Sequence, residues 1–142
     1  MTTTEHDGRL VIVGRVTTGV GRGKHFTRLE WARQQFIDKL WIDPFPGTLN
    51  LIVDNTKSMS LWVGIKGTSG VRIDNRNGDA CGARCFPVSI EGQIKAAIVL
   101  PEVEDYPPEQ IEIIAAVQVR EALGIQDGDS IQIGIRSVEV ND

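Results

Sequence analysis

The stretch of sequence that most constrains the fold covers residues 81–100 and reads CGARCFPVSIEGQIKAAIVL. Two runs rich in apolar residues, 81–90 and 93–100, lie on either side of the dipeptide Glu91-Gly92. A gap of two residues that contains glycine, between two such runs, is typical of a tight β-hairpin. We therefore expect two neighbouring antiparallel strands here.

Other apolar segments, on both sides of this hairpin, have the length and composition of strands. The sequence contains 14 valines and 16 isoleucines against 8 leucines and 8 alanines, a balance that favours strands over helices. Near the end, Ile131, Ile133 and Ile135 alternate with other residues, as in a half-buried strand. The candidate segments are 9–17, 48–54, 61–65, 70–73 and 131–140, with a brief apolar stretch at 111–114.

Two segments have the spacing of helices instead. Apolar residues in 27–40 recur every three or four positions, and Thr27 with Glu30 forms the T-x-x-E pattern of a capping box, which predicts a helix start at Thr27. A shorter helix is expected within 117–123, before Gly124. With six to eight short strands, the whole pattern predicts a mainly β fold, a small mixed β-barrel with one longer and one short inserted helix.

Length and composition fit one domain. We place that domain at residues 9–140 of the 142, and we expect the polar residues 1–8 to be disordered. The longest apolar runs, such as 96–100, are far shorter than the ~20 residues that cross a bilayer, and the first residues lack a signal-peptide pattern, so we expect a cytoplasmic protein with no membrane partner. The formal net charge of −4 argues against a nucleic-acid polymer as partner, and no surface pattern demands a dimer, so we expect a monomer.

The two cysteines, Cys81 and Cys85, have C-x3-C spacing and no second pair. A structural zinc site needs about four ligands of this kind, and only His6 and His25 could add imidazoles. We interpret both cysteines as reduced thiols beside a strand.

A glycine-rich segment between the first strand and the long helix is the first candidate site. It consists of Gly19, Val20, Gly21, Arg22, Gly23 and Lys24, a G-x-G-x-G-K sequence. Alternating glycines permit positive φ and let backbone N–H groups converge on phosphate oxygens, while Arg22 and Lys24 add positive charge. The spacing matches neither a P-loop nor a dinucleotide-binding fold, so a plain flexible turn stays open as the alternative.

The second candidate site follows the rigid turn Pro44-Phe45-Pro46-Gly47. In a strand, Thr48 and Asn50 point to the same face because the side-chain period is two. They would present a hydroxyl and an amide carbonyl side by side, which suits Mg²⁺ because this ion prefers hard oxygen ligands and takes the rest of its shell from phosphates and water. The alternative is an exposed threonine and asparagine without a ligand.

The third candidate lies in residues 109–124, where Glu112 interrupts an isoleucine run and Arg120 follows on the short helix. A carboxylate between isoleucines could accept hydrogen bonds from a polar ligand, or it could mark the outward side of a half-buried strand. Arg120 could bind an anion or a neighbouring carboxylate, and the sequence does not decide between these roles.

Several blocks in the same order carry a family resemblance. They read GVGRGKHF (19–26), PFPGTLN (44–50), CFPVSI with the following AAIVLPE (85–102), and EIIAAVQVREALGIQDGD (112–129). On these blocks the chain resembles the archaeal-type CTP-dependent riboflavin kinases over about residues 14–134. The resemblance implies a six-stranded cradle-loop (RIFT-type) β-barrel. It also implies Mg²⁺-dependent transfer of a phosphoryl group from CTP to the ribityl 5′-hydroxyl of riboflavin, which gives FMN and CDP.

The resemblance also assigns residues. Gly19–Lys24 would hold the nucleotide, and Val117, Gln118, Val119 and Arg120 would close over it from the other side. Thr48 and Asn50 would be the Mg²⁺ ligands. Glu112 would contact the flavin, and Glu104 stands where the family has a threonine on the flavin side.

Two departures from the family pattern concern charge. Val103 and Glu104 replace an Arg-Thr pair, and an acidic residue would face a hydroxyl well but a product phosphate badly. Arg22 stands where an acidic residue is common. Two alternatives therefore stay open, a CTP-dependent kinase of another small hydroxyl substrate and a non-catalytic nucleotide- or flavin-binding module. The general base also stays unassigned among Glu104, Asp105, Glu112 and Asp74.

Overall fold

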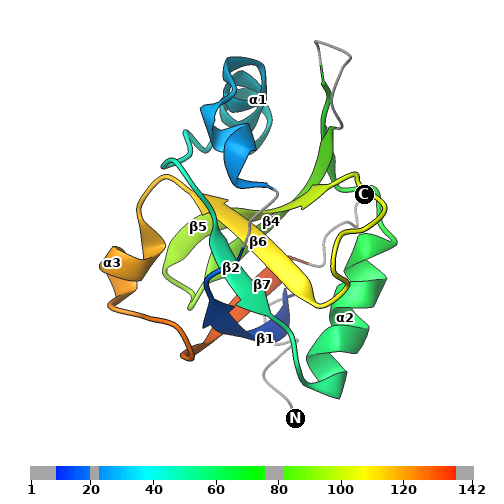
Figure 1. Ribbon diagram of the computed structural model, residues 1–142, viewed down its shortest axis with the longest axis vertical. Helices are drawn as coiled ribbons and strands as arrows, with labels where there is room; N and C mark the ends of the chain where they lie inside the picture. Colours follow the sequence, from blue (N-terminus) through cyan, green and yellow to red (C-terminus); the bar gives the residue numbers. More distant parts are fainter. Residues whose placement is uncertain (1–8, 20–22, 76–81, 137–142) are drawn as a thin grey trace.

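The protein is a closed antiparallel β-barrel with helices on its outside (Figure 1). The computed structural model describes residues 9–19, 23–75 and 82–136. Six strands follow one another around the barrel in the order β4-β5-β6-β2-β1-β7, and pairing between β4 and β7 closes it. This confirms the predicted mainly β fold and its six-stranded barrel. The strands are β1 (Arg9–Thr17), β2 (Leu49–Ile52), β4 (Ala83–Ile90), β5 (Ile94–Pro101), β6 (Gln110–Ala115) and β7 (Ser130–Arg136).

Strand β4 has a different neighbour along each half of its length. Its first residues, 83–85, pair with the short strand β3 (Val71–Ile73), and its last residues, 88–90, pair with residues 133–135 of β7. β5 lies along the other edge of β4 over the whole length. β3 therefore extends the sheet beyond the barrel, and the strand expected at 70–73 is confirmed.

The predicted hairpin connects β4 and β5. Glu91 and Gly92 have φ of 52° and 67°, and the Gln93 N–H donates to the Ile90 carbonyl at 2.9 Å. Positive φ at two consecutive turn residues matches the right-handed twist of the flanking strands. The register Ile90 opposite Ile94 continues to Ala83 opposite Pro101, so the hairpin is confirmed.

Two apolar clusters pack on the two faces of the sheet. One fills the barrel and includes Ile12, Leu51 and Ile133, and the other lies under the segment 24–40 and includes Phe36, Ala97 and Ile114. β5 contributes to both, because Ala96 and Ile98 face the first cluster while Ala97 and Val99 face the second. Burial on both faces explains why this strand is a continuous apolar run and does not alternate.

The long helix expected at 27–40 consists of three short pieces. They are the 3₁₀ helix η2 (Lys24–Arg28), α1 (Glu30–Gln35) and the π-helical turn η3 (Phe36–Leu40). The predicted capping box was wrong, since α1 begins after Leu29 and has no side-chain cap. The Thr27 hydroxyl instead donates to the Lys24 carbonyl at 2.6 Å and accepts the Gly47 N–H at 2.9 Å. Thr27 thus fixes the turn before β2 and does not cap a helix.

A further helix, α2 (Thr56–Lys66), replaces the strand expected at 61–65. Asn55 caps its first turn by accepting the Ser58 N–H at 2.8 Å, and Trp62 and Ile65 are buried on its inner face. α2 runs along the side of the barrel, on the opposite side from α3 (Figure 1). α3 (Val119–Leu123) ends at Gly124, whose φ is 66°, so the short helix is confirmed. Among the described residues, no helix has the length and apolar character that a membrane crossing requires.

Candidate functional site

Three neighbouring strands bring polar residues into one row. Asn50 of β2 lies opposite Thr17 of β1 on one side and opposite Glu112 of β6 on the other. Residues directly opposite in an antiparallel pair project to the same face of the sheet. The predicted Mg²⁺ ligand Asn50 and the predicted flavin contact Glu112 are therefore neighbours across the strands.

The Glu112 carboxylate is fully buried and accepts hydrogen bonds from several segments. Its Oε1 atom accepts the Gly23 N–H at 2.8 Å and the Thr48 hydroxyl at 3.0 Å. Its Oε2 atom accepts the Tyr106 hydroxyl at 2.7 Å and a longer bond from Gln110 Nε2 at 3.4 Å. A buried carboxylate needs such donors to offset the loss of water. Glu112 is thus buried and not exposed to solvent, which excludes the alternative of a solvent-facing position, although it lies on the outer face of the barrel because its neighbours Ile111 and Ile113 line the interior.

Thr48 and Asn50 fit the chemistry of a Mg²⁺ site. The Thr48 hydroxyl gives its hydrogen to Glu112, so its oxygen lone pairs stay available, and its Oγ1 lies 3.4 Å from Asn50 Oδ1. Two hard neutral oxygens on one face suit an ion that takes its other ligands from phosphate and water. Among the described residues, no cluster of three or more His, Cys, Asp or Glu side chains offers another metal site.

The two ends of the glycine-rich segment lie on this row of polar residues. A Cβ atom added to Gly19 would lie 4.0 Å from Asn50 Cγ, and one added to Gly23 would lie 3.1 Å from Glu112 Oε1. Gly23 has φ of −84°, so it is needed for close approach to the carboxylate and not for positive φ. Lys24 is exposed at the start of η2, and Val20, Gly21 and Arg22 lie outside the described residues.

Of residues 117–120, Arg120 contacts the end of the chain segment that leads into the glycine-rich segment. The Arg120 guanidinium donates to the Thr17 carbonyl at 3.3 Å and to Thr18 Oγ1 at 3.4 Å, just before Gly19. Arg120 also pairs with Asp127. The hydrogen bond from Arg120, and then the one from Thr18, hold the pKa of the Asp127 carboxyl below its usual range. The loop before β2 and the start of α3 together line a pocket, whose walls are Phe45, Pro46, Gly47, Thr48, Leu49, Ile113, Ala115, Val117, Gln118, Val119 and Arg120.

A second pocket, of about 400 Å³, lies beside the loop that joins β5 and β6. This volume falls within the ~300–1,000 Å³ typical of small-molecule sites. Its walls are Lys66, Arg84, Leu100, Pro101, Glu102, Val103, Glu104 and Tyr106. Burial, and then the charge of Glu112, raise the pKa of Tyr106 well above its ordinary value, so the phenol keeps its proton and donates to Glu112. Tyr106 therefore connects this second pocket to the buried carboxylate.

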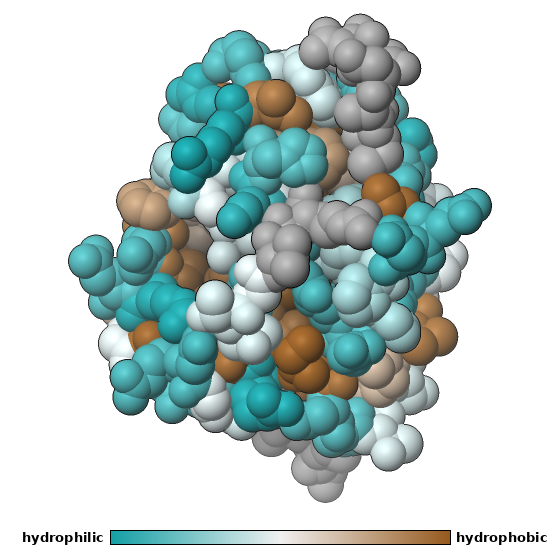
Figure 2. All heavy atoms as spheres, viewed as in Figure 1, coloured by the Kyte–Doolittle hydropathy of each residue, from teal (hydrophilic) through white to brown (hydrophobic). Residues whose placement is uncertain are grey.

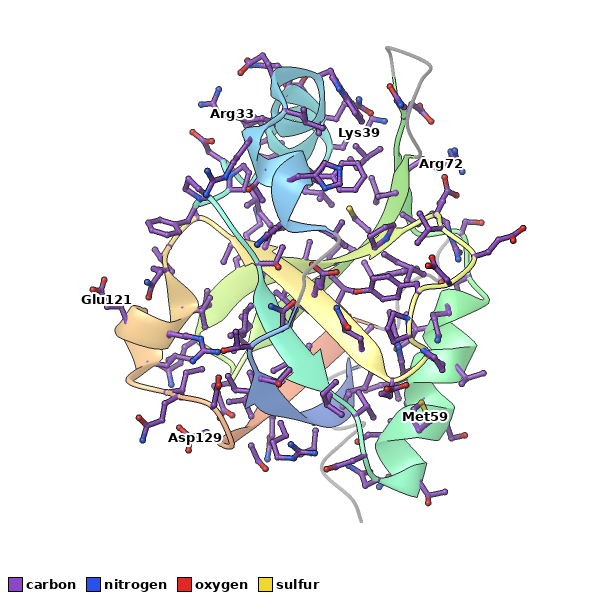
Figure 3. All side chains as sticks on the ribbon, in the orientation of Figure 1. Arg33, Lys39, Met59, Arg72, Glu121 and Asp129 are labelled. Carbon is purple, nitrogen blue, oxygen red and sulfur yellow. The ribbon has the colours of Figure 1, made fainter. Side chains whose placement is uncertain are left out.

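The structure brings together most of the predicted residues that it describes. Glu104 lines the second pocket, while Asp74 pairs with Arg72 at 3.1 Å. Figure 3 shows Arg72 near the helical segment that carries Lys39, and not beside β2 and β6, which weakens Asp74 as a general base. On the face drawn in Figure 2, hydrophilic residues predominate and apolar residues form small separate areas.

The sequence did not identify Tyr106 as a site residue, nor the partners Thr18 and Asp127 of Arg120. In each of these contacts, the two residues meet only because the barrel or the course of a loop brings their segments together. No local spacing indicated them. The nearest available signal was the proline-rich composition of residues 101–108, because prolines limit the conformations that a loop can adopt.

Comparisons with known proteins give matches over most of this chain. The family model CTP-dep_RFKase, described as a domain of unknown function, DUF120, matches residues 16–135. A protein of Methanocella arvoryzae named riboflavin kinase is 40% identical over 134 residues, 91% of this chain and 58% of that relative. Riboflavin kinases of Methanosarcina acetivorans and Archaeoglobus fulgidus are 42% and 35% identical, over 86% and 92% of this chain and 52% and 57% of their own lengths. The chain thus spans little more than half the length of these relatives.

Proposed function

Since the chain belongs to the CTP-dep_RFKase family, whose model matches residues 16–135, we propose that it is a Mg²⁺-dependent riboflavin kinase with CTP as phosphoryl donor. It would transfer the γ-phosphate of CTP to the ribityl 5′-hydroxyl of riboflavin and release FMN and CDP. The buried carboxylate of Glu112 carries this proposal. It contacts Gly23 of the glycine-rich segment, the metal candidate Thr48, and Tyr106 of the second pocket.

The nucleotide would lie between the glycine-rich segment and residues 117–120. Backbone N–H groups of Gly19–Lys24 and the Lys24 ammonium would bind phosphate oxygens, as in other glycine-rich phosphate sites. The contact of Arg120 with the strand end before Gly19 supports a role for it near the same phosphates, where its positive charge would be shared with its partner Asp127. The overall charge of −4 does not oppose a nucleotide when positive groups are gathered locally.

Thr48 Oγ1 and Asn50 Oδ1 would hold Mg²⁺. When bound, Mg²⁺ supplies positive charge that offsets the negative charge on the transferring phosphoryl group. Because the Thr48 hydroxyl donates its hydrogen to Glu112, its oxygen lone pairs would remain available to the metal.

Riboflavin would enter from the second pocket, lined by Tyr106 and Glu104, which we call the acceptor-side pocket, with its 5′-hydroxyl directed toward Glu112. In the reaction, the 5′-oxygen forms a bond to the γ-phosphorus, and the bond from that phosphorus to the β–γ bridging oxygen breaks, so CDP leaves with the electron pair. The hydroxyl proton passes to water or to a carboxylate. Because the transition state is loose, the protein acts mainly by positioning these groups and balancing charge.

Glu104 favours a second candidate, a CTP-dependent kinase that phosphorylates a different small hydroxyl substrate. It is exposed and lines the acceptor-side pocket, so it presents one carboxylate to a ligand, while Glu102 beside it is paired with Arg72 and the cationic Lys66 and Arg84 line the same pocket. Carboxylates accept hydrogen bonds from hydroxyl groups but repel an anionic product. The choice between the two candidates thus concerns the acceptor alone.

The test is an incubation of the purified protein with riboflavin, Mg²⁺ and each of CTP, ATP, GTP and UTP in turn, followed by chromatographic detection of FMN. We expect FMN with CTP and little with the other three nucleotides. CTP binding without FMN from any nucleotide would contradict riboflavin as acceptor and favour the second candidate. If the protein neither binds CTP nor forms FMN, both kinase candidates are contradicted.

A further inference from the structure

The hydroxyl of Tyr106 makes the shortest hydrogen bond to Glu112, at 2.7 Å to Oε2. Tyr106 lies in the loop between β5 and β6, and its half-buried ring packs against the core that fills the barrel. Glu102, Val103 and Glu104 of the same loop line the acceptor-side pocket together with Tyr106. Its hydroxyl is therefore the point where this loop meets the row of polar residues on β2 and β6.

The four donors that the described residues supply to Glu112 divide between its two oxygens. Gly23 and Thr48 bind Oε1, while Tyr106 and Gln110 bind Oε2. The last torsion of a glutamate side chain is broad, so packing and rotamer preference do not fix the plane of the carboxylate. Hydrogen bonds must fix it, and on Oε2 the bond from Gln110 is long, at 3.4 Å.

We infer that Tyr106 is a positioning residue, whose hydroxyl fixes the Glu112 carboxylate so that Oε1 holds the Gly23 N–H and the Thr48 hydroxyl. Without this hydroxyl, the carboxylate can rotate about its last torsion and both bonds to Oε1 weaken. The end of the glycine-rich segment and the orientation of the metal candidate Thr48 then both depend on one phenol. This inference concerns the ligand-free protein, and only its kinetic consequence rests on the proposed function.

A purely structural role for Tyr106 makes a different prediction. If the residue only anchors its loop by packing, phenylalanine would replace it without effect, because the ring stays the same. If loss of the hydroxyl only destabilises the whole fold, amides throughout the barrel would exchange faster together. The positioning role affects the Gly23 amide specifically.

The experiment measures amide hydrogen exchange of the ¹⁵N-labelled, ligand-free protein by NMR, for the wild type and Tyr106→Phe. We expect the Gly23 amide to exchange about fivefold faster or more in Tyr106→Phe, since its bond to Oε1 opens more often. The Val16 amide, which donates to the Asp129 carbonyl at 2.8 Å and does not touch Glu112, serves as the reference and should not change. Ser60→Ala removes an exposed hydroxyl on α2 and is the matched control, with both amides as in the wild type.

Two results would overturn the inference. One is a Gly23 exchange rate in Tyr106→Phe within about twofold of the wild type, and the other is an equal acceleration at Gly23 and Val16. A kinetic arm then follows FMN formation, where we expect kcat to fall about tenfold and the KM for riboflavin to change about threefold or less. An unchanged kcat would contradict the positioning role in catalysis. If the wild type forms no FMN, the proposed function fails, while the exchange data still decide the role of Tyr106.

Discussion

The Thr48 hydroxyl has two roles at the candidate site, as a donor to Glu112 and as a candidate metal ligand, whereas Asn50 offers only its side-chain oxygen to a metal. The Thr48 hydroxyl donates to the fully buried Glu112 at 3.0 Å, and its oxygen also faces the side on which a metal would bind. Asn50 is half-buried, and its described side-chain contact is the 3.4 Å approach to Thr48. Substitutions at the two positions should therefore separate the effect on stability from the effect on metal-dependent turnover.

We predict that Thr48→Val lowers the free energy of unfolding by about 1–2 kcal/mol, because it takes a donor from a buried carboxylate. Asn50→Ala should change it by less than about 1 kcal/mol. Both variants should lose at least about tenfold of the Mg²⁺-dependent turnover, as expected for loss of a metal ligand. Urea denaturation and FMN formation measure the two effects, and Thr48→Ser, which keeps the hydroxyl, is the control. If Thr48→Val has the same free energy of unfolding as the wild type, the bond to Glu112 does not contribute to stability.

At this scale the sequence identified side chains better than it identified contacts. The pairing of Thr48 with Asn50 was predictable because a period of two in a strand determines which residues share a face. The isoleucines around Glu112 showed that it lies in a buried strand, but not that four donors converge on it. Its donors Gly23 and Tyr106 come from separate loops, 89 and 6 positions away. Only the closed barrel brings both loops to the same carboxylate.

At the scale of elements, α2 is where the sequence interpretation was wrong. The window LWVGI at 61–65 has the composition of a short strand, and five residues are too few to distinguish a strand from one side of a helix. The signal that could have identified the helix lies upstream, because Asn55 is a favoured N-cap residue and caps the helix through the Ser58 N–H. Ser58 in turn accepts the Val13 N–H at 2.9 Å, which attaches the helix to β1.

We predict that Ser58→Ala lowers the free energy of unfolding by about 1–3 kcal/mol. Ser58 is buried, and its loss leaves the Val13 N–H without this acceptor. Ser60→Ala lies on the same helix but is exposed, so it should stay within about 0.5 kcal/mol of the wild type. The comparison, by urea denaturation of both variants, removes the common effect of replacing serine by alanine within a helix. Equal stability of the two variants would mean that α2 does not depend on this contact.

For the molecule as a whole, β4 is the strand on which closure depends. It pairs with β3 and β7 along one edge and with β5 along the other, and Cys85 in its first half is fully buried. Burial raises the pKa of the Cys85 thiol from 9.0 to about 12. Below pH 9 the thiol is protonated in both the folded and the unfolded state. Between about pH 9 and 12 it ionises only in the unfolded state, so stability should fall as the pH rises through this range.

We predict that Cys85 reacts with a thiol-specific reagent only when the barrel opens. With Cys81→Ser removing the other thiol, labelling of the native protein at pH 8 should be slower than that of the urea-unfolded chain by a factor on the order of a thousand. Labelling rates at increasing urea concentrations, compared with the unfolding curve, provide the measurement. Rapid labelling at low urea concentration would indicate that β4 separates from its neighbours before the rest of the barrel unfolds.

The register of β1 also governs how this barrel can be joined to other folded units. Arg9 lies opposite Arg136, so the first and last described strands meet at one end of the barrel, whereas Thr17 and Asn50 lie at the other end. At about 3.3 Å per residue, the nine residues of β1 separate the two ends by roughly 25–30 Å. A second domain fused before residue 9 or after residue 136 would attach at the end of the barrel where Arg9 and Arg136 lie side by side, far from Glu112. Proteins longer than this chain could therefore carry additional modules there and leave the candidate site around Glu112 unobstructed.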